Sequence, residues 1–327
     1  MRFLPGSSAA ARGMVPDAEL SAEPFTDDSA LTAARVAALA GDWHPAAKLI
    51  AETAGDWDRR TAVVVALAKL AMEERAWLRA WLADRPGNPD AAVMEAETLV
   101  GLAWQRRGGA RAAHTSRQQS GPFFKLLEHA GPAAWRAAEL AEADPTPWAT
   151  LLKIATGLGA RNQSFDGIWS GLTVRAPHHR IGHDRALQYW CAKWHGSEER
   201  MLEFAVGAAA KAPALSPLPL IAAFEMALEG APTWRAEYVQ KAFDQALPWL
   251  DGDGARHPAT HEDRAYTILA LMHNSRYDEA VAQFRRLGGH ADGHVWNFTE
   301  DIRGMADPVK RFARTRTLAC RRAAKQA

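Results

Sequence analysis

The stretch from Pro177 to Pro213, PHHRIGHDRALQYWCAKWHGSEERMLEFAVGAAAKAP, decides the fold because it has the punctuation of one complete helix-turn-helix repeat. A proline opens it, two amphipathic segments follow with residues 195–197 between them, and a second proline closes it after 36 residues. That length is close to the period of helical solenoids. Ser197 precedes two glutamates, so it is the predicted N-cap of the second helix.

Similar proline-opened units flank this stretch. Their starts near residues 145, 177, 213 and 258 are spaced by 32, 36 and 45 residues, which is a loose period. Helix-favouring alanine, leucine and arginine are abundant, whereas alternating apolar runs of strand length are hard to find. We therefore predict an all-α fold, and more specifically an α-solenoid of antiparallel helical hairpins.

Local signals divide the chain into four parts. Two Gly-Asp-Trp triplets, at residues 41–43 and 55–57, predict that the glycine ends one helix and the aspartate caps the next. Asp28 or Ser29 is the predicted first N-cap, and Pro89 suits a first helical turn. The predicted parts are a flexible leader over 1–27, N-terminal helical hairpins over 28–113, a loop over 114–121, and a C-terminal helical-repeat region with a basic capping helix over 122–327.

One segment carries a family resemblance. In SRYDEAVAQF, residues 275–284, a small residue, an aromatic, an alanine and a phenylalanine recur in the order found in the second helix of a tetratricopeptide unit. These are Ser275, Tyr277, Ala280 and Phe284. DRPGNPDA, residues 84–91, is similar to the linker between such units. The resemblance implies a tetratricopeptide-like superhelix that binds proteins or peptides.

A second resemblance lies inside the opening stretch. KWHGSEERMLEF, residues 193–204, resembles a Lys/Arg-Trp-Gly-Gly-Ser motif of uncharacterised bacterial helical-repeat proteins, with His195 in the place of the first glycine. That family implies no particular activity.

Composition excludes several classes of function. The 39 basic and 38 acidic residues give a net charge of +1, which argues against a nucleic-acid partner. No apolar run reaches the roughly 18 residues of a membrane-spanning helix, and Pro5 and Gly6 interrupt the first apolar run before it reaches the length of a signal peptide. The two cysteines, Cys191 and Cys320, form no CxxC pair and are predicted to be buried thiols of a cytoplasmic protein.

The basic tail, residues 307–327, has the amphipathic pattern of a membrane-surface or nucleic-acid helix. Its apolar face is modest and the whole chain is nearly neutral. We therefore interpret it as the helix that caps the solenoid.

The candidate binding residues are aromatic and cationic. Trp104 is followed by Arg106 and Arg107, and an arginine beside a tryptophan makes a cation–π contact or binds an anion. Trp190 and Trp194, spaced by four, would share one helical stripe, either as core or as a stacking platform. The predicted partner-binding residues are Trp104, Arg106, Gln188, Trp190, Lys193 and Trp194.

The histidines of PHHRIGHD offer an alternative chemistry. His179 and His183 fall at i and i+4 if a helix includes both, a spacing that suits zinc. The glutamate of an HExxH motif is missing, however, and an inter-repeat turn capped by His183 or Asp184 is the commoner arrangement. We therefore predict no metal and no other cofactor.

No phosphate loop, dinucleotide fingerprint, nucleophile elbow or zinc ribbon occurs in the sequence. The function expected is non-catalytic binding of a peptide or protein on the concave face of the solenoid. The alternative is a small-molecule-binding helical protein, or an enzyme of a bacterial secondary pathway, that uses tryptophan with histidine or glutamate side chains.

Overall fold

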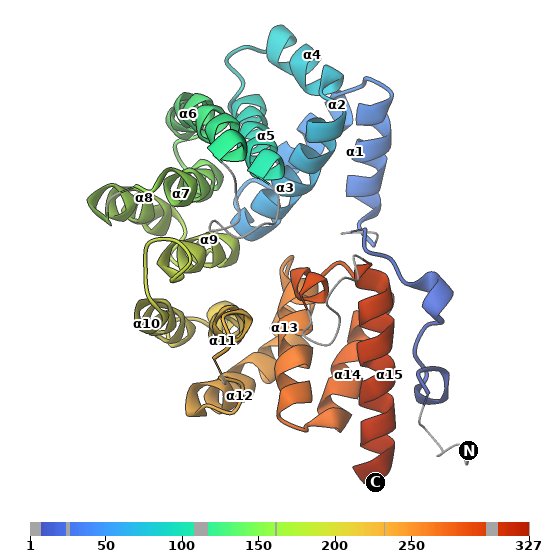
Figure 1. Ribbon diagram of the computed structural model, residues 1–327. Coiled ribbons are helices and arrows are strands. Elements are labelled where there is room, and N and C mark those ends of the chain that lie inside the picture. The colour runs from blue at the N-terminus through green and yellow to red at the C-terminus, as the bar shows by residue number, and fades with distance from the viewer. Residues whose placement is uncertain are drawn as a thin grey trace. The chain divides into compact units, whose positions relative to one another are not determined.

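A computed structural model of the chain describes residues 8–23, 27–107, 117–160, 162–231, 233–298 and 307–326, without the side chains of 117–120 (Figure 1). Within these ranges the backbone forms fifteen α-helices and several short 3-10 turns. The described ranges contain no strand, only one isolated bridge between Ser21 and His290. The prediction of an all-α fold is confirmed.

The chain divides into two compact units. We call residues 25–204 the central unit, and residues 1–24 together with 205–327 the terminal unit. The boundary between residues 204 and 205 lies within α10. The helices before it are α1 Ser29–Leu39, α2 His44–Glu52, α3 Trp57–Glu73, α4 Ala76–Asp84, α5 Pro89–Arg107, α6 Arg117–Leu140, α7 Thr146–Leu158, α8 Asn162–Arg175 and α9 Arg180–Trp190. Those from the boundary onward are α10 Glu198–Ala209, α11 Leu218–Leu228, α12 Glu237–Asp251, α13 Thr260–His273, α14 Tyr277–Leu287 and α15 Pro308–Gln326.

Short polar side chains start many of these helices. Asp28 accepts a hydrogen bond from the backbone N–H of Leu31 at 2.9 Å and caps α1, and Ser197 caps α10 by accepting from Arg200 at 3.2 Å. Asp56 caps α3 in the same way. These predicted caps are confirmed. The first Gly-Asp-Trp triplet differs, because Asp42 accepts from His44 while Trp43 occupies the N-cap position of α2.

In the central unit, α3, α5, α7 and α9 pack one against the next, and we call these four helices the inner helices. Helix α6 packs against both α5 and α7, and α8 packs against α7. Trp77 and Trp81 of α4 are fully buried and so belong to the core. Residues 117–121, predicted as part of a loop, form the first turn of α6, whereas 114–116 lie outside the described residues.

In the terminal unit, α13, α14 and α15 pack in sequence, and Ala280 and Phe284 of α14 are fully buried. The described part of the predicted leader, residues 8–23, packs in this unit. Ser21 donates its backbone N–H to Gly289 and accepts from Ala291. Backbone hydrogen bonds of Ser21 thus join the end of this segment to the residues that follow α14.

The structure also bears on the predictions about the two cysteines and about membrane-spanning helices. Cys191 and Cys320 are both buried free thiols, as predicted. Among the described residues, the helices lack the combination of length and apolar character that crossing a bilayer requires.

Candidate functional site

Two of the predicted binding residues meet in the central unit. Trp104 lies near the end of α5, and Trp194 lies in the turn between α9 and α10. Their ring centroids are 5.3 Å apart with planes at 77°. The guanidinium of Arg107 lies 4.6 Å from the centroid of Trp194 and 5.6 Å from that of Trp104. We call Trp104, Arg107 and Trp194 the arginine–tryptophan cluster.

The charge of Arg107 is unusual in its surroundings. Burial lowers the pKa of its guanidinium. Within the part of the chain that the structure describes, no carboxylate pairs with it, and its contacts are the two indole faces. A partly desolvated guanidinium on aromatic faces binds an anion more strongly than one in water, because less hydration is lost on binding. The cluster can therefore accept a carboxylate or phosphate.

The turn before α10 places Trp194. Helix α9 ends at Trp190, so Trp190 and Trp194 do not share a helical stripe, and that prediction is wrong. The turn is tied to α7 by His195, whose Nε2 lies 2.8 Å from the carbonyl oxygen of Thr156. Gly196 lies so close to the backbone of Trp190 that a Cβ added to it would be 1.8 Å from the carbonyl oxygen. A turn formed by close backbone approach therefore directs the indole of Trp194 toward α5.

Replacing Gly196 with alanine is expected to destabilise the chain by about 1–3 kcal/mol, because the added methyl group overlaps the Trp190 carbonyl. Thermal unfolding followed by tryptophan fluorescence measures the loss. Gly167→Ala in α8 is the matched control, since nothing lies within 4 Å of its added Cβ. Alanine should raise stability there by about 1 kcal/mol. Equal effects of the two substitutions would contradict this account.

The other predicted residues lie apart from the cluster. Trp190 packs against Phe165, with ring centroids 5.2 Å apart. Gln188 lies 3.9 Å from the sulfur of Cys191. Arg106 and Lys193 are exposed, and Arg107 rather than Arg106 covers the indoles.

A buried group of charges lies between the inner helices, and sequence reasoning missed it. Glu97 of α5 accepts hydrogen bonds from Thr150 Oγ1 at 2.6 Å and from Arg185 Nη2 at 2.7 Å. Lys153 Nζ lies 3.3 Å from the same carboxylate. The Glu97 side chain is 3% exposed and that of Lys153 is 27% exposed, so the lysine forms the open side. We call these four residues the charged cluster.

The charged cluster holds one carboxylate between two cations. Burial alone would raise the pKa of Glu97, but Arg185 and Lys153, with hydrogen bonds from Thr150 and Arg185, lower it to about 2. Burial lowers the pKa of the Lys153 amine, opposed by Glu97. Glu97 therefore stays ionised at neutral pH, and with both cations charged the cluster carries one net positive charge.

Both clusters lie along the same two helices, α5 and α7. Glu97 and Trp104 are seven residues apart on α5, which corresponds to about 10 Å along a helix. On α7, Gly157 follows Lys153 by one turn, and a Cβ at Gly157 would lie 3.4 Å from the Trp104 ring. The inner helices thus present a partly open lysine on α7 and an aromatic cation site nearer the C-terminal ends of α5 and α7.

Histidine has a structural role at the N-terminal ends of the inner helices. His179, not His183 or Asp184, caps α9, because its Nδ1 accepts from the backbone N–H of Gly182 at 3.0 Å. Its Nε2 lies 3.0 Å from Thr61 Oγ1 of α3, and burial lowers its pKa. Both ring nitrogens of His179 thus contact protein atoms. His183 Nδ1 lies 2.9 Å from the His179 carbonyl oxygen, so the structure does not aim the two rings at one metal.

One sequence signal could have revealed the charged cluster. Lys153 is the only charged residue of TPWATLLKIATGL, residues 146–158, and Glu97 precedes the uncharged run TLVGLAWQ, residues 98–105 of α5. A lone charge in an otherwise apolar helix is seldom buried without a partner. The identity of each partner depends on tertiary packing.

Comparison of the chain with protein-family models, with curated proteins and with solved structures finds no match.

Proposed function

We propose that this chain is a non-catalytic, cytoplasmic binding protein whose central unit recognises an acidic segment of a peptide or protein. In this proposal the helices form a tetratricopeptide-like α-solenoid, and the inner helices present the binding face. The observation that carries it is the arginine–tryptophan cluster, a partly buried guanidinium whose contacts within the described residues are aromatic rings.

The packing of the helices supports the solenoid. Successive pairs, α5 with α6 and α7 with α8, pack as hairpins, while α3, α5, α7 and α9 pack one against the next. A solenoid of hairpins has this order, because each repeat buries its apolar face on the following one. Two buried free thiols, Cys191 and Cys320, support a reducing compartment.

The chemistry of the inner helices favours an acidic ligand. A carboxylate on Arg107 would gain a charge-assisted hydrogen bond, and the rings of Trp104 and Trp194 offer flat apolar surface beside it. Lys153, on the neighbouring inner helix α7, suits a second acidic group of the same peptide. Two cationic positions on adjacent inner helices match an acidic segment better than a neutral one.

Fluorescence anisotropy with labelled synthetic peptides tests the proposal. Peptides rich in aspartate, glutamate and aromatic residues are compared with lysine-rich peptides of equal length. We expect the acidic set to bind, and Arg107→Ala to weaken binding about tenfold or more. Arg106→Ala is the matched control, because Arg106 immediately precedes Arg107 in the same helix, is exposed and does not cover the indoles. Absence of binding, or equal losses in both variants, would refute the proposal.

A small-molecule ligand is the second candidate, and Lys153 favours it. Burial lowers the pKa of this amine, which makes it a better base or nucleophile than an exposed lysine. Native mass spectrometry of the chain purified from its own cytoplasm tests this candidate. A metabolite that copurifies with the wild type and is lost from Lys153→Met would support it, and an empty wild-type chain would count against it.

A further inference from the structure

The terminal unit gathers histidines around the start of α13. His261 is the second residue of this helix, and His290 follows α14. His294 donates its backbone N–H to the carboxylate of Glu262, the residue after His261, at 2.9 Å. His261 and His290, 29 residues apart in the chain, are therefore neighbours, and Glu262 contacts the backbone of His294.

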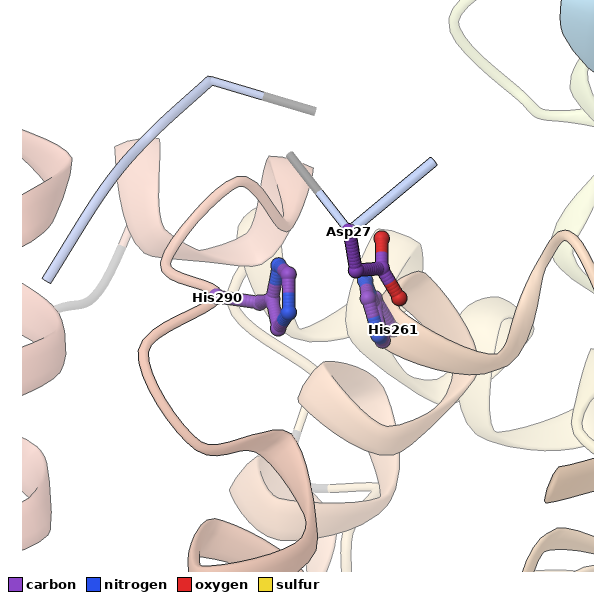
Figure 2. Close-up of side chains that lie close together, drawn as sticks. All are labelled: Asp27, His261 and His290. Carbon is purple, nitrogen blue, oxygen red and sulfur yellow. The ribbon is translucent and has the colours of Figure 1, made fainter. Parts of the chain in front are cut away.

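His261 and His290 are the closest of these side chains. Their imidazole rings stack with centroids 4.0 Å apart and planes at 26° (Figure 2). A nitrogen of one ring lies within 4.8 Å of a nitrogen of the other. Both side chains are partly exposed, which leaves a path from solvent. Figure 2 also labels Asp27, which belongs to the central unit.

The backbone holds both histidines in place. His261 lies in the first turn of α13, whose next turns are buried. His290 lies between two backbone hydrogen bonds, from Ser21 N–H to the Gly289 carbonyl at 2.9 Å and from Ala291 N–H to the Ser21 carbonyl at 2.8 Å. A binding site whose ligands come from fixed backbone loses little entropy when it closes.

We propose that His261 and His290 form the two-histidine core of a site for a borderline divalent metal such as Zn²⁺, Ni²⁺ or Cu²⁺. Neutral imidazole is a preferred ligand of these ions, with metal–nitrogen bonds of about 2.0–2.1 Å. Two such bonds at a tetrahedral angle bring the nitrogens to about 3.4 Å apart, so both rings turn about their side-chain bonds from the stacked arrangement to aim one nitrogen each at the metal. Water completes the coordination.

Metal titration of the full-length chain tests this site. Isothermal titration with Zn²⁺ measures stoichiometry and affinity, and electron paramagnetic resonance of the Cu²⁺-loaded chain reports bound nitrogens. We expect one tight site per chain with a two-nitrogen signature. His261→Gln and His290→Gln should each lower the affinity about tenfold or more and remove one nitrogen from the spectrum.

His129→Gln is the matched control, because His129 is an exposed histidine of α6 in the central unit. It should leave titration and spectrum unchanged. Circular dichroism of the metal-free variants checks that each is folded. Tight binding that survives in the double variant His261→Gln/His290→Gln would overturn the proposal, as would a wild-type chain that binds none of the three metals.

Discussion

Replacing Glu97 with glutamine is expected to lower the free energy of unfolding by about 3–5 kcal/mol, one of the two largest effects of a single substitution in this chain. The carboxylate is buried between Arg185 and Lys153 and accepts a further hydrogen bond from Thr150. Glutamine retains the size but leaves two cations without a counter-charge in the interior, where desolvation is costly. Urea unfolding followed by tryptophan fluorescence measures the loss, since ten of the thirteen tryptophans lie in the central unit.

The same substitution should change how stability depends on pH. The folded-state pKa of Glu97 is about 2 against 4.5 in the unfolded chain, so its contribution is complete above pH 4.5 and is lost as the pH falls to about 2. That difference corresponds to about 3 kcal/mol. In Glu97→Gln the slope of stability with pH between about 4.5 and 2 should be shallower than in the wild type.

Glu139→Gln on the exposed face of α6 is the control for both measurements. It should change stability by no more than about 0.5 kcal/mol and leave the pH profile unaltered. If Glu97→Gln kept the wild-type slope between pH 4.5 and 2, the assignment of this carboxylate as the acid-sensitive group would be wrong.

The helix termini could be predicted from the sequence because their signals are local. A cap such as Asp28 or Ser197 acts on a backbone N–H three residues away, so the pattern that predicts it lies within one turn. The Trp190 and Trp194 pair shows the limit of such reasoning. Its spacing of four implies a stripe only if the helix continues, and the helix stops at Trp190.

The charged cluster could not be predicted in the same way. Glu97 meets Thr150 and Arg185, which are 53 and 88 residues away in the chain. Spacing along one helix contains no information on which distant helix supplies the partner. The same holds for Arg316 of α15, which is fully buried and pairs with Asp17, 299 residues away in the chain, at 2.5 Å.

The fixed position of residues 8–23 has a related cause. Their sequence lacks helical periodicity, and that pattern was the reason to expect a flexible leader. In the terminal unit the order of this segment comes from pairing with distant residues, through the backbone of Ser21 and the carboxylate of Asp17. A segment without local preference can therefore be held by partners that the sequence pattern does not reveal.

Replacing Arg60 with methionine is expected to cost about 3–5 kcal/mol of stability, comparable to the loss at Glu97. Arg60 is buried in α3 and donates from Nε to Asp144 at 2.6 Å and from Nη1 to the Ile50 carbonyl at 2.9 Å. It also pairs with Asp90 in the first turn of α5. Burial alone would lower the pKa of its guanidinium, but Asp144 and Asp90 raise it. Methionine would leave the Asp144 carboxylate, 5% exposed, without its cation.

Arg59→Met provides the matched control for this prediction. Arg59 is the preceding residue, is 42% exposed and forms a single ion pair with Asp28, so its loss should cost no more than about 1 kcal/mol. The double variant Arg60→Met/Asp144→Asn should recover part of the stability, because asparagine removes the unpaired charge and retains an oxygen for the N–H of Thr146, which Asp144 accepts at 2.7 Å. Urea unfolding of the wild type, Arg60→Met, Asp144→Asn and the double variant gives the coupling energy between Arg60 and Asp144. A double variant that loses the sum of the two single losses would show that Arg60 and Asp144 act independently, contrary to the charge pairing inferred from their geometry.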